Sequence, residues 1–137
     1  MPLVRFDMIE GRTDDAIKTM LNATHRVLVA SFGIPEHDRY QIVNEHPDAH
    51  FVIEDTGLGI ARTRACVVIE ITTRPHERLA KEKLYQLLSR ELQAKCDLAP
   101  SDLVVSIVTN TDEDWSFGGG RAQFLTGELP SDPHEPR

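Results

Sequence analysis

The sequence lacks the cysteine pattern of a disulfide-rich or zinc-binding protein. Its two cysteines, Cys66 and Cys96, form no C-x-x-C pair, and isolated cysteines outside a secretory context are usually reduced thiols. Histidines spaced for a metal are also missing, because Pro47 interrupts the helix that would align His46 with His50. We therefore expect no metal site and no disulfide.

Long apolar runs and an excess of positive charge are absent as well. No stretch approaches the ~20 apolar residues that span a bilayer, and no basic segment precedes an apolar run at the start of the chain, as in a signal peptide. The formal net charge of −7 argues against a nucleic-acid surface, which requires a basic stripe. These absences predict a cytoplasmic protein with neither a membrane nor a nucleic-acid partner.

The sequence does contain alternating strand and helix patterns. Its 137 residues, 40% hydrophobic and 27% charged, suit one globular core. A helix is expected over about 13–32, because Thr13 can cap it and apolar residues recur every three to four positions. A second helix is expected to open at Pro75, where a missing N–H costs nothing. Strands are expected at the chain start and at 39–45, 50–54, 65–72 and 103–108.

This order predicts an α/β protein of the two-layer α+β kind. Two consecutive β-α-β units, about 2–60 and 61–129, would form a four-stranded sheet with both helices on one face, plus short strands. The nearly continuous apolar run at 65–72 predicts a strand buried on both faces. No segment remains to cover the second face, so we expect self-association as a closed cyclic oligomer.

The segment after the last strand is rich in aromatic residues for a solvated tail. Trp115, Phe117, Phe124 and Leu125 are expected to pack against a neighbouring subunit or to roof a pocket. The glycines at 118–120 lack the lysine-serine signature of a P-loop, so a hairpin turn is the preferred interpretation. Residues 130–137 have the composition of a flexible tail.

The first residues combine a strand with an unusual amine. The initiator methionine is normally removed before a small residue, which would leave Pro2 with a free secondary amine ahead of Leu3, Val4 and Phe6. An α-amino group has a pKa near ~8 and can act as a base, acid or nucleophile at neutral pH. A Met-Pro start also occurs by chance, so the dipeptide alone does not establish catalysis.

Polar residues gather at other predicted strand and helix ends. Arg74 follows a strand and precedes a helix, where anions bind, and its guanidinium could hold a carboxylate bidentately. A simply solvated arginine is the alternative. His76 could titrate or donate to the anion, or be exposed in the first helical turn. Asp38 could hold a proton or orient water, or cap its own loop.

Six short strings accompany Pro2 and the two β-α-β halves: Phe6-Asp7, Glu10–Asp14, Phe32-Gly33, Asp38–Gln41, Glu54–Gly59 and Asp114–Gly118. Together these features resemble the tautomerase superfamily, in particular its malonate semialdehyde decarboxylase subgroup. The resemblance covers residues 2 to about 128. It implies a cofactor-independent enzyme that assembles as a homotrimer, uses its amino-terminal proline and acts on a small carboxylate substrate.

By position, the resemblance implies that Pro2 is the catalytic proline, Asp38 an acidic catalytic residue and Arg74 the first of two substrate-binding arginines. The second arginine of that pattern falls on His76, which is shorter and cannot grip a carboxylate bidentately. Trp115, Phe117, Phe124 and Leu125 would complete the substrate pocket.

Two reactions remain open at this stage, beside a third reading as a non-catalytic trimeric binding module. Neutral Pro2 could move a proton beside a ketone and so interconvert the keto and enol forms of a 2-oxo acid. Protonated Pro2 could polarise the carbonyl of a 3-oxo acid while the carboxylate held by Arg74 leaves as carbon dioxide. A nearby Arg74 lowers the pKa of the amine and a nearby Asp38 raises it.

Overall fold

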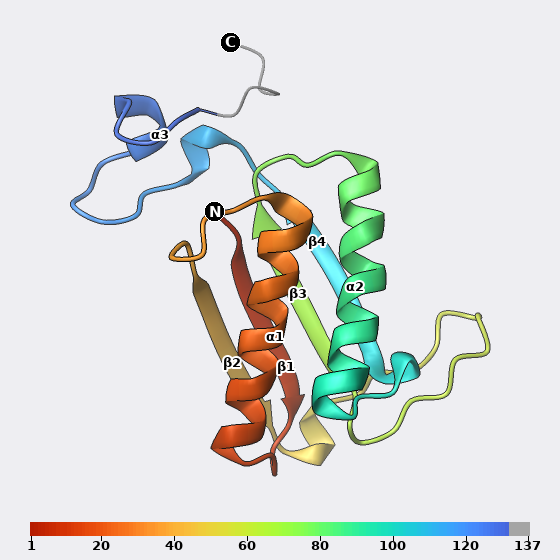
Figure 1. The fold of residues 1–137 in the computed structure, drawn as a ribbon. Coiled ribbons are helices and arrows are strands. Elements are labelled where there is room, and N and C mark those ends of the chain that lie inside the picture. Colours follow the sequence, from red (N-terminus) through yellow and green to blue (C-terminus); the bar gives the residue numbers. More distant parts are fainter. Residues whose placement is uncertain (132–137) are drawn as a thin grey trace.

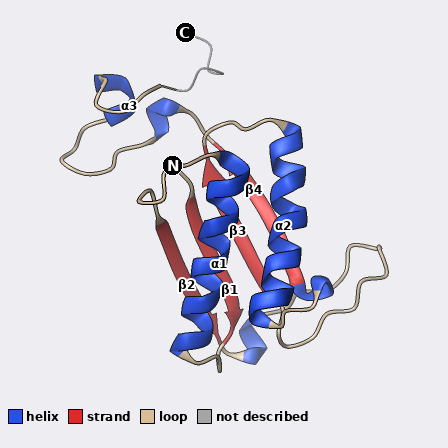
Figure 2. Ribbon diagram, in the orientation of Figure 1, coloured by secondary structure: helices blue, strands red, loops and turns tan. Residues whose placement is uncertain are grey.

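The computed structural model describes residues 1–131, which form two layers (Figure 1). A sheet makes one layer, and two long helices lie side by side on one of its faces (Figure 2). The expected tail at 130–137 falls mostly on residues 132–137, which lie outside the described part. In chain order the main elements are β1 Leu3–Ile9, α1 Asp14–Phe32, β2 Tyr40–His46, β3 Val67–Thr73, α2 Arg78–Cys96, β4 Leu103–Thr109 and the short α3 Gln123–Thr126.

The strand order confirms the predicted four-stranded sheet built from two β-α-β units. The order is β2-β1-β3-β4. β1 pairs with β2 and β3 with β4 in parallel, each pair being joined by one helical crossover. The two units meet where β1 pairs with β3 in antiparallel fashion, with Leu3 opposite Thr72 and Met8 opposite Val67.

The first helix begins and ends as its sequence predicts. Thr13 is its N-cap, and the Thr13 hydroxyl accepts a hydrogen bond from the Ala16 amide at 3.1 Å. At the other end Gly33 adopts a left-handed conformation with φ of 66°, and its amide donates to the Val29 carbonyl. A residue with a side chain is strained at that φ. The chain therefore turns back towards the sheet directly after Phe32.

The second helix begins later than predicted. It starts at Arg78, with Glu77 in an extended conformation as the N-cap, so Pro75 lies in the preceding loop. The His76 ring stacks on Phe32 and lies within hydrogen-bond distance of the Thr73 hydroxyl. These contacts hold the residues after β3 against the end of α1, and they delay the first helical turn.

Two further predictions from the sequence are wrong. The expected short strand at 50–54 is a 3₁₀ turn, Asp48–His50, followed by a loop, and within residues 1–131 the sheet has only its four strands. That loop is organised locally, because the Asp55 carboxylate accepts hydrogen bonds from the Gly57 and Gly59 amides. The glycines at 118–120 form no hairpin, since no strand flanks them and α3 follows.

The hydrophobic core lies between the helices and one face of the sheet. Val4, Phe6 and Met8 of β1 alternate towards it, as do Val67, Ile69 and Ile71 of β3. Between these positions, β3 residues are only half-buried, so the prediction of burial on both faces does not hold within one chain. Leu84, Leu88 and Leu92 supply the fully buried face of α2.

The described residues also show the state of the two cysteines and were searched for metal-binding clusters and membrane-spanning helices. Cys66 is buried and Cys96 partly buried; both thiols are free, and burial raises the pKa of each. No group of three or more metal-binding side chains occurs in residues 1–131. Over the same residues, no helix has the length and apolar character needed to cross a bilayer.

The face of the sheet opposite the helices is open in the single chain. From the strand alternation, Leu3, Ile42, Val68 and Val108 lie on this face, while Arg5 and Glu70 stand opposite each other at its centre. Ile42 is 39% exposed and Val108 46% exposed. We propose that further copies of the chain cover this open face in a trimer.

This proposal predicts that light scattering gives a mass three times the 15.4 kDa of the chain. Ile42→Lys should dissociate the assembly, because it places an unpaired charge in the covered face. Leu79→Lys, at a residue 74% exposed on α2, is the matched control and should leave the mass unchanged. A monomeric wild-type protein would contradict the proposal.

Candidate active site

The strand register brings three chain segments together at one end of the sheet. Leu3 pairs with Tyr40 on one side and lies opposite Thr72 on the other. The start of the chain therefore lies between the segment that enters β2 and the segment that leaves β3. Asp38 belongs to the first of these segments and Arg74 to the second, so the topology itself gathers the predicted site residues.

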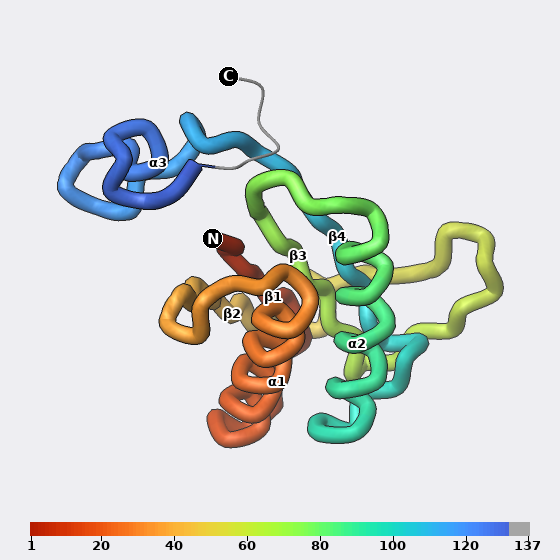
Figure 3. The backbone as a smooth tube through the Cα atoms, turned by 45° about the horizontal axis from the view of Figure 1, so that its top comes forward, coloured from red at the N-terminus to blue at the C-terminus, as the bar shows by residue number. Residues whose placement is uncertain are grey.

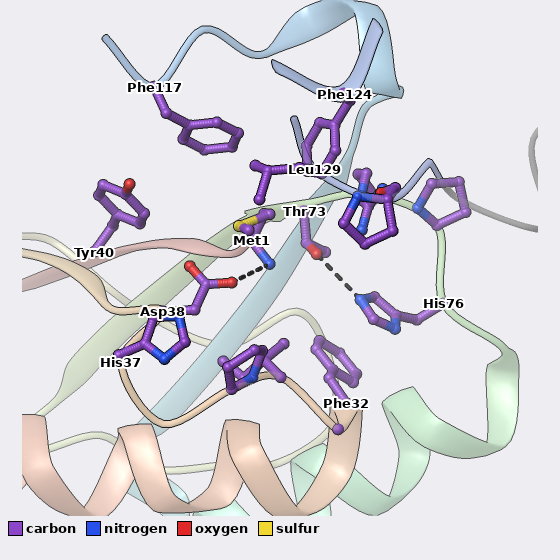
Figure 4. A pocket seen from close by; sticks show the side chains of 16 residues that line it. Met1, Phe32, His37, Asp38, Tyr40, Thr73, His76, Phe117, Phe124 and Leu129 are labelled. Carbon is purple, nitrogen blue, oxygen red and sulfur yellow. Dashed lines mark hydrogen bonds and ion pairs between the residues drawn. The ribbon is translucent and has the colours of Figure 1, made fainter. Parts of the chain in front are cut away.

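A cavity of about 550 Å³ lies at this end of the sheet. Met1, Asp38, Arg74 and His76 contribute to its polar lining, and one side is strongly apolar (Figure 4). Its size and its mixture of apolar walls with a few polar groups are typical of small-molecule sites. The remaining lining residues are Phe32, Gly33, Ile34, Pro35, His37, Tyr40, Thr73, Pro75, Phe117, Phe124, Leu129 and Pro130.

The terminal amine points into this cavity. The nitrogen of Met1 lies 3.1 Å from Oδ2 of Asp38, whose side chain is only 4% exposed (Figure 4). The contact is an ion pair without the alignment of a good hydrogen bond, because Oδ2 has no partner of satisfactory hydrogen-bond geometry. Pro2 follows directly; it is buried and is not itself part of the lining.

Burial is the main influence on the terminal amine. It lowers the pKa of the Met1 amine below its usual value, because desolvation disfavours the charged form. Asp38 opposes this effect through its contact and its charge, while the charge of Arg74 adds to the lowering. The sequence predicted the contributions of Asp38 and Arg74 but did not reveal that desolvation exceeds both.

Hydrogen bonds to Nη1 and a contact with an aromatic ring hold the planar guanidinium of Arg74 in place. Its Nη1 donates to Oδ1 of Asp112 at 2.8 Å and to the Pro130 carbonyl at 3.2 Å. Its guanidinium carbon lies 3.9 Å from the centre of the Phe124 ring. Because α2 begins only at Arg78, Arg74 lies before the helix and not in its first turn.

Two contacts hold the His76 ring at the cavity wall. Its ring is stacked on Phe32, with 3.8 Å between the ring centres and planes 8° apart. Nε2 lies 3.2 Å from the Thr73 hydroxyl, and one of these groups donates to the other (Figure 4). The ring lines the cavity, but its plane is fixed by the stack.

The segment after β4 supplies the apolar wall. It leaves the body of the fold and lies on the same side as the chain start (Figure 3). Phe117 and Phe124 meet edge to face, 5.4 Å apart, and both line the cavity. Trp115 stacks behind Phe117, and Leu125 is 63% exposed; neither lines the cavity, so their predicted substrate contacts remain predictions.

Several residues of the site are not predicted by the sequence. The pattern of α1 places Phe32 only on the apolar face of its helix, but Phe32 also carries His76 at the cavity wall. Composition places Leu129 and Pro130 at the end of the domain and in the tail, yet both line the cavity. Asp112 gives no sequence signal at all, because a single aspartate in a run of polar residues is typical of an exposed loop.

The sequence matches two family models, both described as tautomerase enzymes, over residues 38–118 and 2–61. The first match alone covers more than half of the chain. This chain belongs to the tautomerase family. Among curated proteins, the probable tautomerase YrdN of Bacillus subtilis is 52% identical to it over 129 residues, which are 94% of this chain and 100% of that protein.

Solved structures show the same relationship. This chain matches a malonate semialdehyde decarboxylase, studied as wild-type, mutant and inactivated protein, with a TM-score of 0.90 and 46% identity over 93% of this chain and 98% of the other. A second one, FG41 malonate semialdehyde decarboxylase inhibited by 3-bromopropiolate, is 34% identical, with a TM-score of 0.89 and coverage of 95% and 99%. A fused 4-OT trimer at 20% identity and a TM-score of 0.74 shares the fold, over 91% of this chain and 98% of its own.

The electrostatics of this tautomerase predict opposite effects for two substitutions. Asp38→Asn should lower the pKa of the terminal amine further, because it removes the charge that favours protonation, and Arg74→Gln should raise that pKa. The pH dependence of acylation of the terminal amine, followed by mass spectrometry, reports this pKa because only the neutral amine reacts.

Asp48→Asn, at the opposite end of β2, is the control and should leave the acylation profile unchanged. Shifts of the same sign for Asp38→Asn and Arg74→Gln would show that these two charges do not act on the amine as the geometry indicates.

Proposed function

We propose that this tautomerase acts on a small oxo-acid anion and uses the amine of Pro2, exposed by removal of Met1, as its acid/base group. The observation that carries the proposal is the meeting of the chain start, Asp38 and Arg74 in one cavity. Arg74 would bind the substrate carboxylate, and the amine and Asp38 would handle the proton. The apolar wall, which includes Phe117, Phe124 and Leu129, would exclude water from the reacting atoms.

The position of Pro2 suits this role. Pro2 is the residue before β1 and is buried, so its nitrogen would begin the mature chain at the floor of the site. In the uncleaved chain, Met1 and its amine lie in the cavity beside Asp38. The decarboxylase of 46% identity has been studied as a mutant with alanine in place of its first residue, a proline, which supports a functional amino-terminal proline in this group of proteins.

Decarboxylation of a 3-oxo acid is the first candidate reaction. The two relatives with TM-scores of 0.90 and 0.89 are both malonate semialdehyde decarboxylases. In this reaction a protonated Pro2 would polarise the 3-carbonyl, and Arg74 would orient the carboxylate for loss of carbon dioxide. Asp38 would favour the protonated amine that the step requires.

Keto–enol tautomerisation of a 2-oxo acid is the second candidate, and a specific observation favours it. Burial lowers the pKa of the Met1 amine at this end of the sheet, and the same apolar surroundings would act on an amine at Pro2. A neutral amine is the form needed to remove a proton from the carbon beside the ketone. Activity through this neutral base falls as the pH drops below the amine pKa, whereas decarboxylation through the protonated amine falls as the pH rises above it.

A trimer that only binds ligands, without catalysis, is the third reading. The fused 4-OT proteins of similar fold include a symmetric trimer, which supports the same assembly for this chain. A protein that only binds ligands requires no free amine at Pro2. Blocking or changing this amine therefore distinguishes binding alone from the two reactions.

The first prediction of the proposal concerns Pro2. Intact mass should show that Met1 is absent. Pro2→Ala replaces the rigid secondary amine with a more mobile primary amine at the same place, so kcat should fall by up to about 100-fold as the acid/base group loses its position. Malonate semialdehyde, which yields acetaldehyde on decarboxylation, and the enol of an aryl 2-oxo acid distinguish the two reactions.

Two matched proteins sharpen the Pro2 test. An uncleaved extension that keeps the Pro2 nitrogen in an amide should abolish activity, while Pro100→Ala, in the turn before β4, should have no effect. Full turnover with the uncleaved extension would remove Pro2 from the mechanism.

The second prediction concerns position 76. His76→Arg adds a permanent charge and a bidentate donor to the cavity wall, so it should lower KM for malonate semialdehyde by roughly tenfold through a charge-assisted contact. Steady-state kinetics on both substrates would measure the change. His37→Arg, at another lining residue, is the control; an equal gain there would mean that added charge acts without regard to position.

A further inference from the structure

Within residues 1–131, the protein forms hydrogen bonds to only one edge of the Arg74 guanidinium. Both of its hydrogen bonds within residues 1–131 are donated by Nη1, to Asp112 and to Pro130. Nε and Nη2 make none there. These two groups form the side of the guanidinium that presents two parallel N–H bonds, the geometry that a carboxylate accepts bidentately.

Another arginine in the same chain shows this edge in use. Nε of Arg121 donates to Oε1 of Glu128 at 3.0 Å, and Nη2 donates to Oε2 at 3.1 Å. A carboxylate on the Nε/Nη2 edge is therefore a contact that this protein already makes on its surface. At Arg74 the equivalent edge is not used by the described protein, and the residue lines the cavity.

Asp112 is built to hold the other edge. Its side chain is 4% exposed, whereas Glu113 and Asp114 in the same 3₁₀ turn are exposed. The turn is fixed by the Thr111 hydroxyl and amide, which both donate to the Asp114 carboxylate. The register places Thr109 beside Thr73, so the turn after β4 lies next to the residue after β3.

We propose that Asp112 is a positioning residue for substrate recognition: it holds Nη1 of Arg74 so that the Nε/Nη2 edge faces a substrate carboxylate. The inference rests on the proposed function only in taking a carboxylate as the ligand. The Pro130 carbonyl and the Phe124 ring assist, since they limit the guanidinium to one plane. Without Asp112 the side chain of Arg74 regains rotamers that do not present this edge, and each must be frozen again on binding.

The test measures binding of pyruvate, a small 2-oxo monocarboxylate, by calorimetry. Asp112→Ala should weaken pyruvate binding roughly tenfold, and Asp112→Asn, which keeps an oxygen acceptor for Nη1, by less than about threefold. Glu113→Ala is the matched control, because it removes an exposed carboxylate from the same turn. In turnover assays, Asp112→Ala should raise KM by the same factor and leave kcat nearly unchanged.

Each other outcome is decisive. Tighter pyruvate binding by both Asp112 variants would mean that Asp112 only offsets the charge of Arg74, and would overturn the proposal. So would a lower Tm for Asp112→Ala with unchanged pyruvate affinity, which is the signature of a purely structural role. Failure of the wild type to bind pyruvate would also overturn it.

The same measurements separate this inference from the proposed reaction. Pyruvate binding that depends on Asp112, in a protein without turnover on either oxo acid, would support the positioning role and refute the enzymatic proposal. Turnover that depends on Pro2 but is insensitive to Asp112→Ala would support the reaction and refute the positioning role.

Discussion

The antiparallel pairing of β1 with β3 is the constraint on which the site depends. Within one β-α-β unit the two strands are parallel, so the start of one strand and the end of the other lie at opposite ends of the sheet. Because β1 and β3 run in opposite directions, the beginning of β1 and the end of β3 coincide, with Leu3 opposite Thr72. This pairing brings an amine from one unit to a guanidinium from the other, and the hydrophobic core beneath holds both in place.

The cavity so formed balances its charges closely. Asp38 and Asp112 are both nearly excluded from solvent, and a buried carboxylate is costly unless a cation accompanies it. Arg74 accompanies Asp112, and the terminal amine accompanies Asp38. A substrate carboxylate would add a negative charge to this set, which the Nε/Nη2 edge of Arg74, not bonded to any of residues 1–131, is suited to receive. The burial of the Met1 amine in this cavity lowers its pKa.

Local patterns in the sequence were sufficient for much of the fold. The cap at Thr13, the glycine at 33 and the apolar periodicity predicted α1 correctly, and the alternation of elements predicted the sheet with both helices on one face. The site residues Asp38 and Arg74 followed from their places at strand ends and from family resemblance. The errors arose where contacts between residues distant in the sequence override the local preference for secondary structure.

Pro75 suits a first helical turn, but α2 begins only at Arg78, after the loop in which His76 stacks on Phe32. The pairing of Asp112 with Arg74 spans 38 residues, and no local pattern carries it.

The loops at the two ends of the sheet differ in their tolerance of insertions and deletions. The connection from Gly33 to Tyr40 is short and closes one wall of the cavity, and Asp38 lies in it just before β2. An added residue there would displace the Asp38 carboxylate from the amine. The long loop between η1 (Asp48–His50) and β3 extends from the far end of the sheet (Figure 1), where Val52 and Leu58 are largely exposed. The Gly33–Tyr40 connection should therefore keep a fixed length even among homologues with different substrates. Insertions and deletions should be better tolerated in the long loop, outside the Asp55 turn.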